Sequence, residues 1–144
     1  MKIKEIKADF FDMLEIYNDT YACHCISACF TLNTGVAREF NFRYDMVSKL
    51  NKLYSGAKGS YPNCLLVERV FNLVVKDRYW NKPTYDTLET SLKLMKEQCL
   101  VLGVEKLCMP LIACGVDKLQ WHKVKNIVVD VFKDTNISIV VCRI

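Results

Sequence analysis

Two hydrophobic periodicities alternate along this chain, and their alternation limits the fold more than any other feature. Residues 2–9, 20–28, 64–70, 71–76, 104–110 and 137–142 have the alternating or β-branched apolar patterns of strands. Residues 35–53, 83–103 and 121–131 carry apolar side chains at helical spacing, and residues 10–19 form a short helical or irregular connection. The alternation predicts an α/β protein with a mixed sheet and helices on both faces.

Length and composition indicate one globular unit. The chain has 144 residues, 51% of them hydrophobic and 25% charged, with five glycines and three prolines, which excludes a disordered or collagen-like chain. No linker interrupts it, so we predict a single domain over residues 1–144. The net charge of +4 comes without a run of five basic residues. It suits an anionic ligand and is weak support for nucleic-acid binding.

The first residues lack the apolar region of a signal peptide, because residues 1–7 alternate charged and apolar side chains. No later stretch approaches the about 18 apolar residues that a membrane span needs. We therefore expect an intracellular protein, cytoplasmic or nuclear, with no membrane partner. The eight cysteines are then expected as free thiols rather than as a disulfide framework.

Ligands of open α/β sheets bind beyond the carboxyl ends of the strands, where loops lead into helices. Residues 27–35, 75–82 and 111–118 meet that condition. The small residues around Gly115 would let backbone N–H groups approach a phosphate, or Gly115 would simply supply the positive φ of an ordinary turn. Asn33-Thr34-Gly35 would likewise either help to hold a diphosphate or only cap the following helix.

Lys76 and Asp117 are candidates for chemistry at this edge. Lys76 follows an apolar strand, and a lysine partly removed from water can act as a nucleophile or Schiff-base former. Its alternative is an ordinary lysine that reaches solvent at the strand end. Asp117 would either act as a general acid/base opposite Lys76 or serve as a helix cap or first-turn acid.

The Cys23-His24-Cys25 run invites a metal interpretation, but strand alternation sends the two cysteines to one face and His24 to the other. No second pair completes a tetrahedral set, so we expect no metal site. Cys114 is the one thiol that is a candidate for a lowered pKa, because it precedes a helix. The favoured interpretation is a small side chain that lets the loop close.

Several sequence blocks resemble the macrodomain family: His24-Cys-Ile-Ser27, Thr34-Gly-Val-Ala37, Lys82-Pro-Thr-Tyr85, and Met109-Pro110 leading to Cys114-Gly-Val-Asp-Lys-Leu-Gln-Trp121. The likeness is greatest to the terminal ADP-ribose protein glycohydrolase branch and runs from about residue 7 to residue 144. It implies a three-layer α/β/α fold and a hydrolase that removes ADP-ribose from modified acidic side chains. The implied partners are ADP-ribose and ADP-ribosylated proteins, with no cofactor and a monomeric state.

The resemblance also implies roles for individual residues. Lys76 would attack C1″ of the distal ribose to form a covalent adduct, and Asp117 would act as the general acid/base. Asp9, Phe10 and Ile144 would lie at the adenine. The other implied ligand-binding residues are Ser27, Asn33, Thr34, Gly35, Val36, Val75, Leu111, Ile112, Ala113, Cys114, Gly115 and Val116.

Four positions depart from the family pattern. Ala8 and Ala113 stand where the family has glycines, and Asn33 and Thr34 replace smaller residues. These changes bear on substrate choice more than on ADP-ribose binding. The alternatives to a protein de-ADP-ribosylating hydrolase are a phosphatase acting on ADP-ribose 1″-phosphate and a reader that binds ADP-ribose without turnover. The most distant alternative is a nucleic-acid-binding module, which only the +4 charge favours.

Overall fold

The structure, a computed structural model, describes residues 1–143. Its elements are β1 (Lys2–Lys7), α1 (Phe10–Ile16), β2 (Tyr21–Ser27), α2 (Gly35–Tyr44), α3 (Met46–Tyr54), the 3-10 turn η1 (Ser55–Ala57), β3 (Asn63–Val67), β4 (Val70–Lys76), α4 (Tyr85–Leu102), β5 (Lys106–Met109), α5 (Trp121–Phe132) and β6 (Ser138–Arg143). Each predicted strand and helix segment therefore corresponds to observed structure, with one helix divided in two. None of the helices described is both long enough and apolar enough to span a bilayer.

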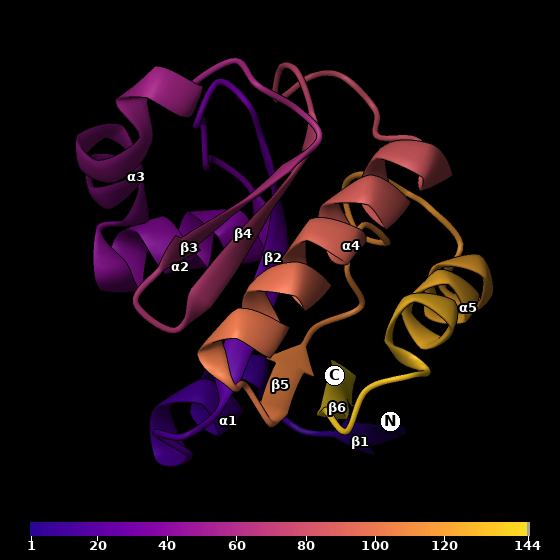
Figure 1. Cartoon of the computed structure of the whole chain (residues 1–144). Coiled ribbons are helices and arrows are strands. Elements are labelled where there is room, and N and C mark those ends of the chain that lie inside the picture. Colours follow the sequence, from indigo (N-terminus) through magenta and orange to yellow (C-terminus); the bar gives the residue numbers. More distant parts are fainter. Residues whose placement is uncertain (144) are drawn as a thin grey trace.

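The six strands form one mixed sheet in the order β1-β6-β5-β2-β4-β3 (Figure 1). All neighbouring strands are parallel except β3, which pairs antiparallel with β4 as a hairpin. The carboxyl ends of β5, β2 and β4 are consequently adjacent at one edge of the sheet. This arrangement brings together the three loops that follow these strands.

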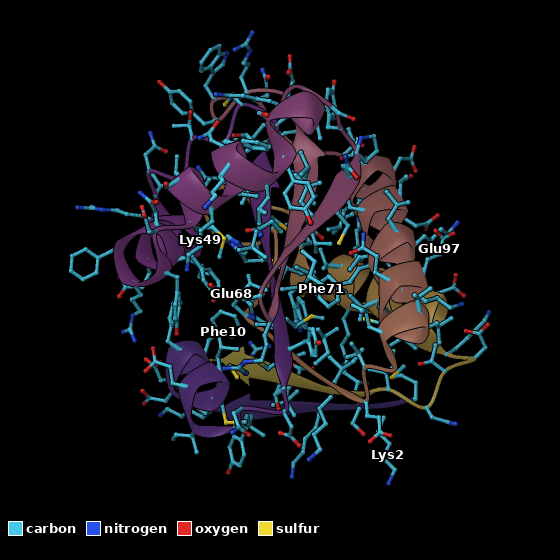
Figure 2. All side chains as sticks on the ribbon, turned by 60° about the vertical axis from the view of Figure 1, so that its left-hand side comes forward. Lys2, Phe10, Lys49, Glu68, Phe71 and Glu97 are labelled. Atoms are coloured by element: carbon cyan, nitrogen blue, oxygen red, sulfur yellow. The ribbon has the colours of Figure 1, made fainter. Side chains whose placement is uncertain are left out.

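Helices cover both faces of the sheet, which confirms the predicted three-layer α/β/α architecture. One apolar cluster joins the sheet to α4 and α5, and a second joins it to α1, α2 and α3 (Figure 1). Phe71, from β4, belongs to the first cluster and Phe10, from α1, to the second, and Figure 2 shows them in these two layers. Two-sided burial explains why β4 reads as a continuous apolar run, VFNLVVK.

The ends of α4 are specified by local chemistry, and its prediction is confirmed. The Thr84 hydroxyl accepts a hydrogen bond from the Thr87 backbone N–H, and the Thr87 hydroxyl accepts one from the Thr84 N–H, which forms a capping box. Gly103 ends the helix with a φ of +71°, a conformation that glycine adopts without a Cβ clash.

The prediction of one helix over residues 35–53 is wrong, because the chain forms α2 and α3 with a sharp bend between them. Asp45 lies at the junction with a φ of +53°. The apolar spacing continues through the bend, since Phe40 of α2 and Met46 and Leu50 of α3 are all buried in the same cluster. Aspartate is among the few residues that tolerate this conformation, so neither glycine nor proline marks the break.

Candidate functional site

The three loops predicted to form a site line one cleft of about 240 Å³ at the carboxyl edge of β2, β4 and β5. Loops that follow adjacent parallel strands must meet at that edge, so the prediction from strand order is confirmed. The cleft is lined by His24, Cys25, Ile26, Ser27, Thr31, Asn33, Thr34, Gly35, Val36, Ala37, Lys76, Tyr79, Pro110, Leu111, Ile112, Ala113, Gly115, Val116 and Asp117.

Lys76 and Asp117 meet in this cleft. Lys76 is the last residue of β4, and Asp117 lies in the loop after β5; the Lys76 Nζ donates to Asp117 Oδ1 at 2.5 Å. Their side chains are only 10% and 11% exposed. Lys76 therefore does not extend into solvent, and Asp117 does not cap a helix, because α5 begins at Trp121 with Gln120 as its N-cap.

The N-terminus of α2 is open toward the cleft. Thr34 occupies the N-cap position, but its side chain makes no capping hydrogen bond, so the expectation that this cluster caps the helix is wrong. Gly35, with a φ of +59°, then begins the helix, and Gly35, Val36 and Ala37 all line the cleft. First-turn N–H groups without an intrahelical partner attract anions, and the helix dipole adds to that attraction.

The loop between β5 and α5 forms the opposite wall of the cleft. Ala113 and Lys118, rather than the predicted Gly115, adopt positive φ values of 60° and 59°. Such a φ costs a residue with a Cβ about 1–2 kcal/mol, and position 113 is one where the resemblance implies a glycine. The loop is held by hydrogen bonds from Leu119 N–H to Ala113 O and from Lys82 Nζ to Val116 O.

His24 lies in the cleft floor as a neutral side chain. Its ring packs against Phe40 of α2, with the ring centroids 4.3 Å apart, while Cys23 and Cys25 pack in the α4–α5 cluster. His24 and the two cysteines therefore lie on opposite faces of the sheet, as predicted. Burial lowers the pKa of His24 to about 4, and Nε2 lies 2.5 Å from Asn72 Oδ1. No group of three His, Cys, Asp or Glu side chains in residues 1–143 has a metal-site arrangement.

The thiols decide between the two interpretations of Cys114. Burial raises its pKa, so Cys114 is a partly buried side chain of the loop and not an activated thiol. Cys29 is different: burial by itself would raise its pKa, but hydrogen bonds with the Ser27 and Thr31 hydroxyls lower it to about 7. Those contacts depend on how the loop folds back on β2. All eight cysteines are free thiols in the structure.

Most of the predicted site residues line the cleft, but four of those described do not. Asp9 is the N-cap of α1, Phe10 is packed in the α1–α3 cluster, Val75 is buried in the α4–α5 cluster, and Cys114 packs against that same cluster. Their side chains pack in the core or cap a helix, whereas the resemblance implied that they contact the ligand. Ile144 lies outside the described residues.

Sequence reasoning did not single out several cleft residues. Thr31 and Tyr79 lie in two of the loops that were expected to form the site, residues 27–35 and 75–82. They were not named individually as site residues. His24 and Cys25 were considered as metal ligands and as part of a block that resembles the macrodomain family, but not as residues that line the site. The signal that could have found them was their place at the carboxyl half of a buried strand next to Lys76.

The chain matches none of the protein-family models. It is 36% identical over 135 residues to the ADP-ribose glycohydrolase OARD1 of Homo sapiens and, equally, to that of Bos taurus, with 88% of each chain covered.

Among solved structures, the macrodomain of Thermus aquaticus DarG superposes with a TM-score of 0.82 at 15% identity, covering 97% of both chains. Thermosipho africanus DarTG in complex with ADP-ribose gives 0.82 at 12% identity, covering all of this chain and 42% of its own. These two likenesses establish the shared fold, and the identity to OARD1 establishes the branch. The chain belongs to the macrodomain family and is a macrodomain of the terminal ADP-ribose protein glycohydrolase type.

Proposed function

We propose that this macrodomain hydrolase binds ADP-ribose in the cleft and removes it from modified acidic side chains of proteins. The observation that carries the proposal is the buried Lys76–Asp117 pair, 2.5 Å apart, at the junction of the three cleft loops. A nucleophile and a proton-transferring group within hydrogen-bond distance are what covalent catalysis requires. The relation to OARD1, whose name states an ADP-ribose glycohydrolase activity, supports the same reaction.

The open N-terminus of α2 and the loop after β5 provide a place for the diphosphate. Within residues 1–143, no protein group accepts a hydrogen bond from the backbone N–H of Gly115 or Val116. Residues of the uncapped first turn of α2 line the same cleft, so backbone amides without a protein partner belong to two of its lining segments. Backbone amides in this arrangement bind phosphate oxygens well.

The order of the strands suggests how the rest of the ligand lies. The carboxyl ends of β1, β6, β5, β2 and β4 follow one another along the edge, and four strand spacings of about 4.8 Å span about 19 Å. An elongated ligand with its distal ribose at Lys76 would extend past the diphosphate loops toward Asp9. We therefore keep Asp9 and Phe10 as proposed neighbours of the adenine, beyond the lined cleft.

The chemistry follows from the contact between the two side chains. Asp117 accepts a proton from Lys76, and the neutral amine then attacks C1″ of the distal ribose. The bond from C1″ to the ester oxygen breaks, and its electron pair leaves with the carboxylate of the acidic side chain. Water subsequently replaces the lysine at C1″, while Asp117 transfers the protons, which releases ADP-ribose and restores Lys76.

The test measures release of ADP-ribose from a glutamate-modified protein by the wild type, Lys76→Ala and Asp117→Ala. We expect each substitution to lower the rate by about 100-fold or more, the usual size of a lost acid–base or nucleophilic group. Lys49→Ala, at a half-buried lysine outside the cleft, is the matched control and should retain the wild-type rate.

Parallel measurements separate the alternatives. Calorimetry with ADP-ribose should show binding, and phosphate release from ADP-ribose 1″-phosphate should be slower than release from protein. Undiminished release by both cleft variants would contradict the mechanism. Tight binding without any release by the wild type would identify a reader, and faster release of phosphate would identify a phosphatase.

A further inference from the structure

Two exposed aromatic side chains stand at the rim of the cleft. Tyr79 and Trp80 lie in the connection between β4 and α4 and are 45% and 63% exposed. Their rings pack edge to face, with centroids 4.9 Å apart and an angle of 86° between the planes. Tyr79 lines the cleft, whereas Trp80 is not among the lining residues, so the pair continues the cleft wall onto the outer surface.

The segment that carries this pair is held in place at several points. The Cys29 N–H donates to Asp77 O, and the Arg78 N–H donates to the side-chain oxygen of Asn81. Lys82 Nζ then donates to the Val116 carbonyl of the loop between β5 and α5. The two residues follow Lys76 by three and four positions, in the loop that connects β4 to α4 (Figure 1).

The surroundings of the pair are basic. Arg78, Lys82 and Lys118 are all exposed. Of the two acidic residues in these loops, Asp117 is paired with Lys76 inside the cleft, and Asp77 lies 3.9 Å from the Arg78 guanidinium. Three positive charges against one negative charge favour an acidic partner. Exposed Trp and Tyr side chains beside a site are the residue types that most often dominate protein–protein binding energy.

We propose that Tyr79 and Trp80, with Arg78 and Lys118, form the docking surface for the acceptor polypeptide, the segment of substrate protein that carries the ADP-ribosylated acidic side chain. This inference rests on the proposed function. Apolar groups of the acceptor pack into the corner between the two rings, and its further carboxylates pair with the basic side chains. Perpendicular rings form a corner rather than the open parallel faces on which successive nucleobases stack, so a polypeptide fits better than a nucleic acid.

The experiment compares Trp80→Ala with Phe42→Ala, which removes an aromatic ring that is 84% exposed on α2 outside the cleft. For Trp80→Ala we expect KM for the modified protein to rise about tenfold, the effect of losing an interface anchor, with kcat and the Kd for free ADP-ribose unchanged. Trp80→Phe should recover part of the loss. Phe42→Ala should match the wild type in all three quantities.

A binding measurement keeps this test separate from the proposed reaction. In an Asp117→Ala background, an ADP-ribosylated acidic peptide should bind more tightly than free ADP-ribose, and adding Trp80→Ala should abolish that difference. Equal affinities for peptide and ADP-ribose would overturn the docking proposal even if the wild type releases ADP-ribose. An effect of Trp80→Ala on an ADP-ribosylated oligonucleotide but not on the peptide would overturn it as well.

Discussion

The Lys76–Asp117 pair and the cluster around Glu5 are two ionic sites of opposite character. Glu5 on β1 accepts hydrogen bonds from Lys125 at 2.5 Å, Arg143 at 2.7 Å and Trp121 at 3.2 Å. These contacts tie β1 to α5 and β6. Asp117, by contrast, accepts a side-chain hydrogen bond within residues 1–143 from Lys76 alone.

The number of donors to each carboxylate shows which one can still form hydrogen bonds with a ligand. A carboxylate with three donors has little left to offer a ligand, and the cluster serves the fold. A buried pair with one contact between its members retains hydrogen-bonding capacity at the wall of a cleft, at a cost in stability, because charges removed from water are incompletely compensated. A polar group in a cleft that still has free hydrogen-bonding capacity is therefore a better candidate for function than one whose capacity is used within the protein.

The largest stability effect should come from breaking the cleft pair. Lys76→Met leaves the Asp117 carboxylate buried without its cation, and we expect unfolding free energy to fall by about 3 kcal/mol. The double variant Lys76→Met, Asp117→Leu removes both charges and should recover most of that loss. Urea unfolding at pH 7 measures both.

Lys49 and Glu68 supply the control, because they form a 2.8 Å ion pair on the surface, where Figure 2 labels them. Lys49→Met should cost less than about 1 kcal/mol, since exposed pairs contribute little. If Lys76→Met lowered the unfolding free energy no more than Lys49→Met does, the proposed difference between the buried cleft pair and a surface ion pair would be contradicted.

The Glu5 cluster should show a smaller, pH-dependent effect. Hydrogen bonds from Lys125 and Arg143 lower the pKa of Glu5 from 4.5 to about 2. The carboxylate therefore stabilises the fold fully above pH 4.5, and the contribution is lost as the pH falls toward 2. We expect Glu5→Gln to cost about 1 kcal/mol at neutral pH.

Unfolding of Glu5→Gln and wild type from pH 7 to pH 2 checks this expectation. The difference in stability should shrink across the window from pH 4.5 to pH 2. A difference that stays constant across this range would show that the cluster acts through side-chain shape rather than charge.

The sequence predicted the layers of the fold and the loops of the site, because strand patterns and strand order are properties of the chain. Lys76 and Asp117 were both expected at this edge of the sheet, and the structure places both in the cleft. Their contact could not be read from the sequence, since it joins positions 41 residues apart through the pairing of β5, β2 and β4. The bend at Asp45 was missed because its apolar neighbours keep helical spacing on both sides.

The cysteines also show that contacts created by the fold could not be predicted from sequence position. Cys114 was selected by its distance in sequence from a helix, yet that loop buries the thiol and raises its pKa. Cys29 owes its lowered pKa to hydroxyls two residues away on either side, which reach it only because the chain turns at Phe30, where φ is +57°. Local backbone conformation, rather than residue type, decided which cysteine is activated.

The central claim is that Lys76 forms a bond to C1″ during turnover. An amine bound there equilibrates with an open-chain imine, which cyanoborohydride reduces to a stable secondary amine. We predict that wild-type protein incubated with an ADP-ribosylated substrate and this reductant loses activity and gains one ADP-ribosyl group, located by mass spectrometry on the peptide containing Lys76, whereas Lys76→Arg gains none. Continued release of ADP-ribose without any trapped adduct, or an adduct on another lysine, would contradict the account.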